Sequence, residues 1–227
     1  MPSKRVSLEK KVEQARNLAA KYMREGWGSR ASVLHAIYDL FETDIPQEMF
    51  YKLCCILDPF HAPASAIYEN GKDSGITTCG ALSSALAAFS MVHGTRELPF
   101  KFWAEGMKPD GWVTRMVDNP SISPEEKAYA FMKGCEEMRY GAYYQIVTRF
   151  KEHFGTTDCF DLMKPYGDPI TRECFRNCDK IVIWTTGMVA QVILEYERNP
   201  NSLKVGDGNV YLAVVRSAHT VKCKRQK

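Results

Sequence analysis

The amino-acid sequence predicts a mainly α-helical protein: a multi-helix bundle with an irregular insertion and a short β element near the C-terminus. Apolar residues recur at helical spacing over several long segments, and capping signals or glycine and proline breaks mark where those segments end. Apolar residues make up 45% of the 227 residues, which is enough to bury a sizeable core. We therefore expect one domain over residues 1–227.

The N-terminal part, residues 7–94, is expected to hold four helices. In chain order they cover 7–25, a segment that starts at Ser29, 47–57 and 78–93. Between the third and fourth helices, residues 58–76 are expected to form a loop, because they contain prolines and the Asn70-Gly71 turn signal. Thr77 or Thr78 is expected to cap the fourth helix, which is rich in small residues and ends at Gly94.

The C-terminal part begins with an irregular insertion, residues 95–122, which is rich in proline and tryptophan. Two long helices follow in the segment 123–198. The first starts at the capping box Ser123-Pro124-Glu125-Glu126 and ends near Phe154, before Gly155. A connector is expected over 156–170, a helix over 171–198, and a tail over 199–227 with a strand at 209–215.

Charge and hydropathy exclude some classes of protein. The formal net charge is only +3 and the basic excess lies at the two termini, so we expect no nucleic-acid partner. No apolar run approaches the length of a membrane span, and the first residues lack the apolar core of a secretion signal. We therefore expect a cytoplasmic protein, in which cysteines serve as metal ligands, catalytic thiols or core residues rather than as a disulfide framework.

Four of the eight cysteines stand in settings that favour chemistry. Cys79 lies at the start of a predicted helix, where free N–H groups favour a thiolate. Cys159 follows the turn after a long helix, where a cysteine has little reason to pack. Cys174 and Cys178 are four residues apart near the start of the last helix, so both sulfurs lie on one helix face and can bind one metal centre. The neighbouring pair Cys54-Cys55 could place one sulfur at such a site, whereas Cys135 is expected in the core and Cys223 in an exposed tail.

The order of these motifs resembles the C_GCAxxG_C_C family of redox-active proteins. The resemblance rests on Cys79-Gly80-Ala81, on the segment Phe154-Gly155-Thr156-Thr157-Asp158-Cys159, and on Cys178-Asp179-Lys180-Ile181-Val182. It covers roughly residues 10–195, and a related domain accompanies a two-iron, two-sulfur cluster in split-Soret cytochrome c. The chain departs from the family pattern at Ser84, where the pattern has glycine, and at Ser29, where it has its first cysteine. The missing sulfur could come from Cys174, Cys54 or Cys55.

The resemblance implies an iron–sulfur cluster bound by Cys79, Cys159, Cys174 and Cys178, with a 2Fe-2S cluster favoured and a 4Fe-4S cluster as the alternative. Zinc would also suit these ligands. The expected role is electron transfer or redox sensing with a redox partner protein, as an accessory oxidoreductase if the protein is an enzyme. A homodimer is a further expectation. The alternatives are a metal-free thiol–disulfide oxidoreductase and a structural zinc-binding protein.

Overall fold

The computed structural model describes much of the chain in atomic detail. The described residues are 8–57, 66–69, 72–75, 77–94, 111, 115, 119–123, 140–167 and 171–203. The chain forms two compact units, one from residues 1–94 and 146–202 and the other from 95–145 and 203–227. The second unit is described in short pieces, such as the turn in which the Asn119 side chain accepts a hydrogen bond from the Ser121 N–H (2.9 Å).

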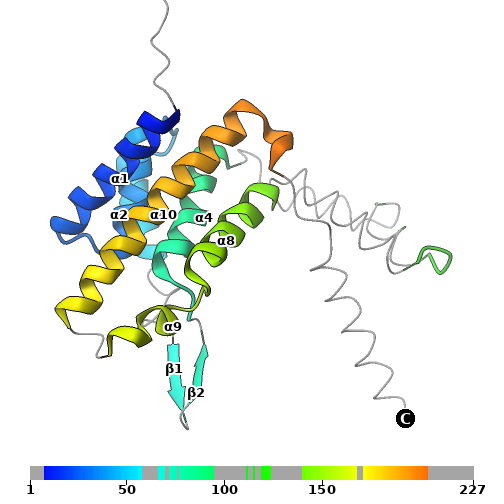
Figure 1. The fold of residues 1–227 in the computed structure, drawn as a ribbon. Coiled ribbons are helices and arrows are strands. Elements are labelled where there is room, and N and C mark those ends of the chain that lie inside the picture. Colours follow the sequence, from blue (N-terminus) through cyan, green and yellow to red (C-terminus); the bar gives the residue numbers. More distant parts are fainter. Residues whose placement is uncertain are drawn as a thin grey trace, which may run out of the picture. The chain divides into compact units, whose positions relative to one another are not determined.

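The first unit is a helical bundle, as its apolar periodicity predicts. Its main helices are α1 (Leu8–Arg24), α2 (Gly28–Leu40), α4 (Gly80–His93) and α10 (Arg172–Arg198). Helix α1 packs on α2 and α10, and α2, α4 and α10 pack against one another (Figure 1). The fully buried core side chains include Leu34, Ile37, Phe89, Val182, Val189 and Ile193.

Helix α10 is the central element of this bundle. Nearly every residue from Ile181 to Ile193 is buried or half-buried, so the helix is covered on several sides. The second half of α8 (Tyr140–Phe154) also lies against it. Arg149 of α8 and Glu195 of α10 form a two-point ion pair with N···O distances of 2.7 and 3.2 Å. Gly155 ends α8 with a φ of 80°, a left-handed conformation that suits glycine.

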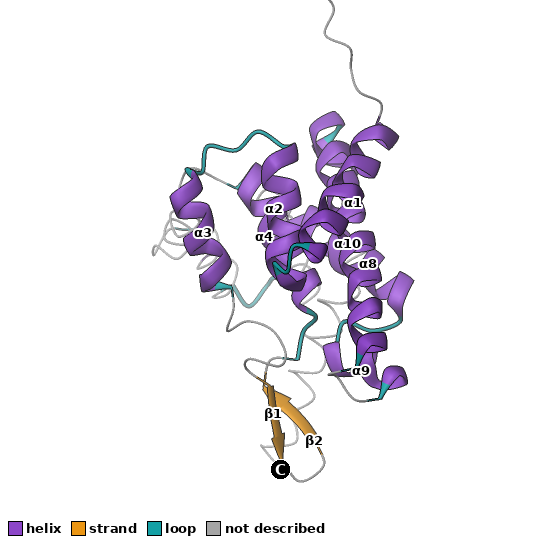
Figure 2. Cartoon of the chain, turned by 90° about the vertical axis from the view of Figure 1, so that its left-hand side faces the viewer, coloured by secondary structure: helices purple, strands orange, loops and turns teal. Residues whose placement is uncertain are grey.

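Helix α3 (Gln47–Ile56) lies to one side of the bundle, next to α2 (Figure 2). Phe50 is its buried residue, and the side chains of Met49 and Ile56 are exposed. The segment after it corrects a prediction. Residues 58–76 were expected to form a loop, but β1 (Ala66–Glu69) and β2 (Lys72–Gly75) pair as an antiparallel hairpin. The two-residue connection is Asn70-Gly71, a sequence that favours hairpins as well as simple turns.

Two further predictions need correction. The residue that caps α4 is Cys79 rather than Thr77 or Thr78, because both threonines are taken up in backbone pairing described below. The predicted connector 156–170 contains the short helix α9 (Cys159–Met163) and the 3-10 helix η2 (Lys164–Tyr166). Three predictions lie wholly or mostly outside the described residues. They are the strand 209–215, the insertion 95–122 and the start of the helix at 123.

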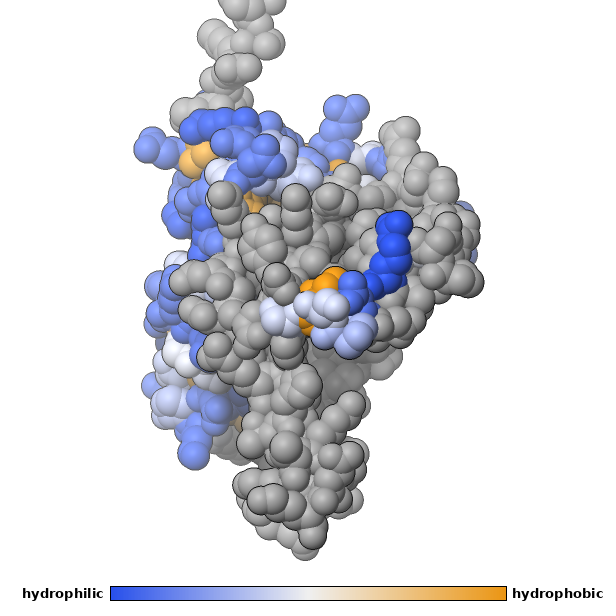
Figure 3. Space-filling model, turned by 90° about the vertical axis from the view of Figure 1, so that its right-hand side faces the viewer, coloured by the Kyte–Doolittle hydropathy of each residue, from blue (hydrophilic) through white to orange (hydrophobic). Residues whose placement is uncertain are grey.

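On the face that Figure 3 shows, most of the visible side chains of described residues are hydrophilic. Among the described residues, no helix is both long and apolar enough to cross a membrane.

Candidate sulfur site

A backbone bridge joins two of the predicted site cysteines, which are 80 residues apart in the sequence. Thr78 and Asp158 form an isolated antiparallel β-bridge. The Cys79 N–H donates to the Thr157 carbonyl (2.9 Å), and the Cys159 N–H donates to the Thr77 carbonyl (2.7 Å). In such pairing the residues one step away from the bridged pair share the opposite face. Cys79 and Cys159 therefore lie diagonally on one face of the bridge.

The other two cysteines come from the first turns of α10. Thr171 is the N-cap of this helix, and its hydroxyl accepts a hydrogen bond from the Cys174 N–H at 3.2 Å. Cys174 is buried and Cys178, one turn further along, is half-buried. The Cys174 Sγ also lies 3.2 Å from the Sδ of Met163, at the end of α9, and donates its thiol hydrogen to it. This contact connects α9 to the start of α10.

Electrostatic interactions couple these four cysteines to one another. Burial raises the pKa of Cys159 to about 12, and repulsion from Cys79, Asp158 and Cys174 adds to the shift. Burial likewise raises the pKa of Cys178 to about 12, with further repulsion from Cys79 and Cys159, from Asp179 and from Cys174. Ionised sulfurs would therefore repel one another at this site. At neutral pH the raised pKa values keep Cys79, Cys159 and Cys178 protonated in the protein without a bound cation.

The start of α4 provides an opposing influence at Cys79. Burial raises the pKa of this thiol, whereas the backbone N–H groups of Leu82 and Ala81 lower it. These N–H groups belong to the first turn of α4 and have no partner within the helix. They lower the pKa of Cys79 although the Cys79 side chain makes no capping hydrogen bond. A thiolate or an anionic cluster at Cys79 would be stabilised by the same groups.

The remaining cysteines lie in other places. Cys54 is half-buried and Cys55 is exposed, both on α3. Burial raises the pKa of Cys54 to about 11, repulsion from Cys55 adds to the shift, and Arg30 opposes it. Neither of these two cysteines contributes to the shifts at Cys159 or Cys178. Cys135 and Cys223, predicted in the core and in an exposed tail, lie outside the described residues.

The donor set suits a soft metal centre, although the thiols are not arranged as ligands. Four thiols and one thioether are brought together, and thiolates are the ligands that iron–sulfur clusters and zinc prefer. Within the described part of the chain, no three His, Cys, Asp or Glu side chains stand in a geometry that could hold a metal ion. A bound cation would offset the repulsion that otherwise opposes ionisation of these sulfurs.

Sequence reasoning missed three contributors to this site. Asp158 caps α9, since its Oδ1 accepts hydrogen bonds from the N–H groups of Phe160 (2.8 Å) and Asp161 (3.1 Å). Aspartate is a common N-cap residue, so Asp158 could have predicted a helix that starts at Cys159. Thr171 stands three residues before Cys174, which is the spacing of an N-cap. Met163 carried no local signal, because its contact with Cys174 depends on how α9 folds back toward α10.

The departure at Ser84 is also visible in the structure. This residue lies on α4, five positions beyond Cys79, and its side chain is fully buried. Among the described residues its hydroxyl has no hydrogen-bond partner. A serine thus fits the place where the family pattern has glycine, at the expense of a buried unpaired hydroxyl.

One family of known proteins matches the chain. No curated protein and no solved structure matches the chain. A family model described as "Putative redox-active protein (C_GCAxxG_C_C)" matches residues 59–192, more than half of the chain. This segment contains the hairpin, α4, the backbone bridge and all four clustered cysteines. The chain therefore belongs to the C_GCAxxG_C_C family.

Proposed function

We propose that the protein binds an iron–sulfur cluster through Cys79, Cys159, Cys174 and Cys178 and transfers electrons to, or senses redox state for, a partner protein. The observation that carries this proposal is the convergence of these thiols from three separate elements. In this partly buried setting the thiolate forms would repel one another, and bound iron would supply the positive charge that allows the sulfurs to lose their protons. When bound, the cluster supplies one-electron redox chemistry.

The protein's own residues have distinct parts in this proposal. The four sulfurs bind, the Thr78–Asp158 bridge holds Cys79 near Cys159, and Thr171 orients the first turn of α10. The N–H groups at the start of α4 favour electron-rich sulfur, which raises the potential of a cluster. A 2Fe-2S cluster is favoured over 4Fe-4S by the resemblance to the split-Soret cytochrome domain.

The pKa values disfavour the metal-free alternative. A thiol–disulfide oxidoreductase needs an accessible cysteine whose pKa is depressed. The pKa values of Cys79, Cys159 and Cys178 are all raised, because burial removes solvent from the charged form. Structural zinc remains chemically compatible with the same ligands, so the experiment must separate iron from zinc.

The test is anaerobic purification followed by a visible spectrum and by iron, sulfide and zinc analysis. We expect a brown protein with matched iron and sulfide. Single Cys→Ser changes at 79, 159, 174 and 178 should each lower bound iron. Cys54→Ser and Cys55→Ser are matched controls on α3 and should not. Zinc without iron would replace the proposal with a structural site, and a metal-free protein after reconstitution would overturn it.

A further inference from the structure

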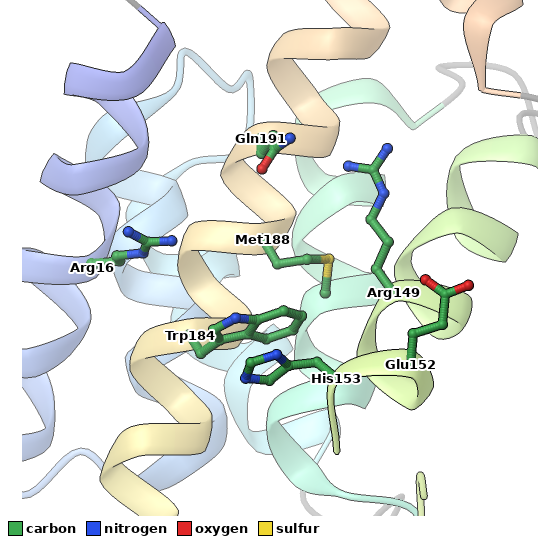
Figure 4. A pocket seen from close by; sticks show the side chains of 7 residues that line it. All are labelled: Arg16, Arg149, Glu152, His153, Trp184, Met188 and Gln191. Atoms are coloured by element: carbon green, nitrogen blue, oxygen red, sulfur yellow. The ribbon is translucent and has the colours of Figure 1, made fainter. Parts of the chain in front are cut away.

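A second candidate site lies along the middle of α10, away from the cysteines. It is a pocket of about 430 Å³ lined by Arg16, Arg149, Glu152, His153, Trp184, Met188 and Gln191. That volume is within the range of small-molecule sites. Figure 4 shows that the lining comes from three helices, with Arg16 on α1, Arg149 on α8 and Trp184 on α10.

The floor of the pocket is an aromatic platform. The rings of His153 and Trp184 stack with centroids 4.0 Å apart and an interplanar angle of 7°. In Figure 4 the imidazole lies on one side of the indole, while Met188 and Gln191 lie toward the other. Phe154 packs edge-on against the same indole, with ring centroids 5.1 Å apart, which further fixes its plane. His153 is exposed, so a planar ring can stack on the side of its imidazole that faces away from Trp184.

Arg149 is one of two guanidinium groups beside this platform. It is held by its two hydrogen bonds to Glu195, and Gln191 donates to the same carboxylate (2.7 Å). A guanidinium has five N–H donors, so this pair leaves donors for a ligand while restricting the side chain to one orientation. The side chain is about a quarter exposed, so a ligand can reach it.

Arg16 approaches from α1 and depends on a glycine. A Cβ added at Gly187 would lie 2.5 Å from the Arg16 Nε and 2.8 Å from its Cγ. Glycine is unfavourable in the middle of a helix, and α10 carries one at the point where the Arg16 side chain crosses it. Arg16 uses one nitrogen for Glu13, at 3.4 Å, and keeps its other donors.

We propose that this pocket binds a planar organic anion, with its ring against the exposed His153 imidazole of the His153–Trp184 stack and its carboxylate or phosphate between Arg16 and Arg149. The lining also contains the carboxylate of Glu152, which repels an anion. Removing this charge should therefore raise the affinity for the ligand, whereas removing either arginine should lower it. The inference is independent of what the cysteine site binds, because none of the lining residues belongs to that site.

Flavin mononucleotide is a suitable probe, since it joins a planar ring to a phosphate. Binding to the purified full chain would be measured by quenching of flavin fluorescence, with riboflavin lacking the phosphate and inorganic phosphate lacking the ring as competitors. We expect flavin mononucleotide to bind at least about tenfold more tightly than riboflavin, the size of a charge-assisted hydrogen bond to arginine. Phosphate should compete weakly.

Variants then assign the residues. Arg16→Met and Arg149→Met should each weaken flavin mononucleotide by about tenfold and leave riboflavin unchanged. Glu152→Gln should strengthen it, and Gly187→Ala should weaken it by moving Arg16 without lowering thermal stability. Arg24→Met is the matched control on α1 and should leave binding intact. Equal affinity for riboflavin and flavin mononucleotide, or no loss in either arginine variant, would overturn the proposal.

Discussion

Raising the pH should destabilise the metal-free protein through its clustered thiols. The pKa values of Cys159 and Cys178 are about 12 in the folded protein, against 9.0 for an ordinary cysteine. Above pH 9 the unfolded chain loses these protons while the folded chain keeps them. Stability supplied by the protonated thiols is therefore complete below pH 9 and is lost progressively between pH 9 and 12.

The expected magnitude follows from the same values. At pH 10 each of the two thiols lowers the free energy of unfolding by about 1.4 kcal/mol, or about 3 kcal/mol together. Solvent screening at these half-buried sulfurs reduces this, so we expect a loss of about 1.5–3 kcal/mol. With a urea m-value of about 2 kcal/mol/M, the unfolding midpoint should fall by roughly 1 M between pH 7.5 and pH 10.

The assay is urea unfolding followed by circular dichroism, with a chelator and a phosphine reductant present. The double variant Cys159→Ser/Cys178→Ser is the comparison, because groups such as Tyr22, whose burial also raises its pKa, contribute equally in both proteins. The double variant should lose clearly less stability than the wild type over this pH range. An equal loss in both would refute the reasoning. In protein reconstituted with iron and sulfide, the thiol-dependent loss should disappear, since bound sulfurs carry no proton to lose.

Two further predictions concern single residues. Asp158→Asn keeps a good N-cap but removes a charge that raises the pKa of Cys159, so this thiol should react faster with a disulfide reagent at pH 8. Asp158→Ala should in addition lower the free energy of unfolding by about 1 kcal/mol. Identical reaction rates in Asp158→Asn and wild type would contradict this prediction. Ile193→Ala, at a fully buried position of α10, should lower the free energy of unfolding by about 2–5 kcal/mol in urea denaturation, whereas a loss below 1 kcal/mol would mean that α10 is not central to the core.

Much of the helical framework could be predicted from local patterns. The span 171–198 and the observed helix Arg172–Arg198 nearly coincide, because an apolar run fills the middle and Asn199-Pro200 marks the C-terminal end. The hairpin was mistaken for a loop because its strands are only four residues long and the Asn-Gly signal fits both structures. The short helix α9 was missed because five residues show no periodicity.

Local settings singled out the four cysteines one by one, whereas their grouping into one site was predicted by motif order and the resemblance. Spacing alone placed Cys174 and Cys178 together. Nothing local indicates that Cys79 meets Cys159, since that contact depends on the pairing of Thr78 with Asp158 across 80 residues of sequence. The choice among Cys174, Cys54 and Cys55 depends on tertiary structure, because it depends on where α3 packs, and Cys174 stays a prediction.

The pocket shows most clearly what one-dimensional patterns omit. Arg16 and Arg149 each look like ordinary solvent-facing residues of amphipathic helices, and Gly187 looks like a weak point in α10. Once the three helices pack, the glycine is what allows the Arg16 side chain to lie across α10, and Glu195 fixes Arg149 beside Trp184. Gly187→Ala therefore separates two explanations of this glycine. If it serves only helix packing, alanine should lower stability, whereas if it seats Arg16, alanine should preserve stability and weaken anion binding.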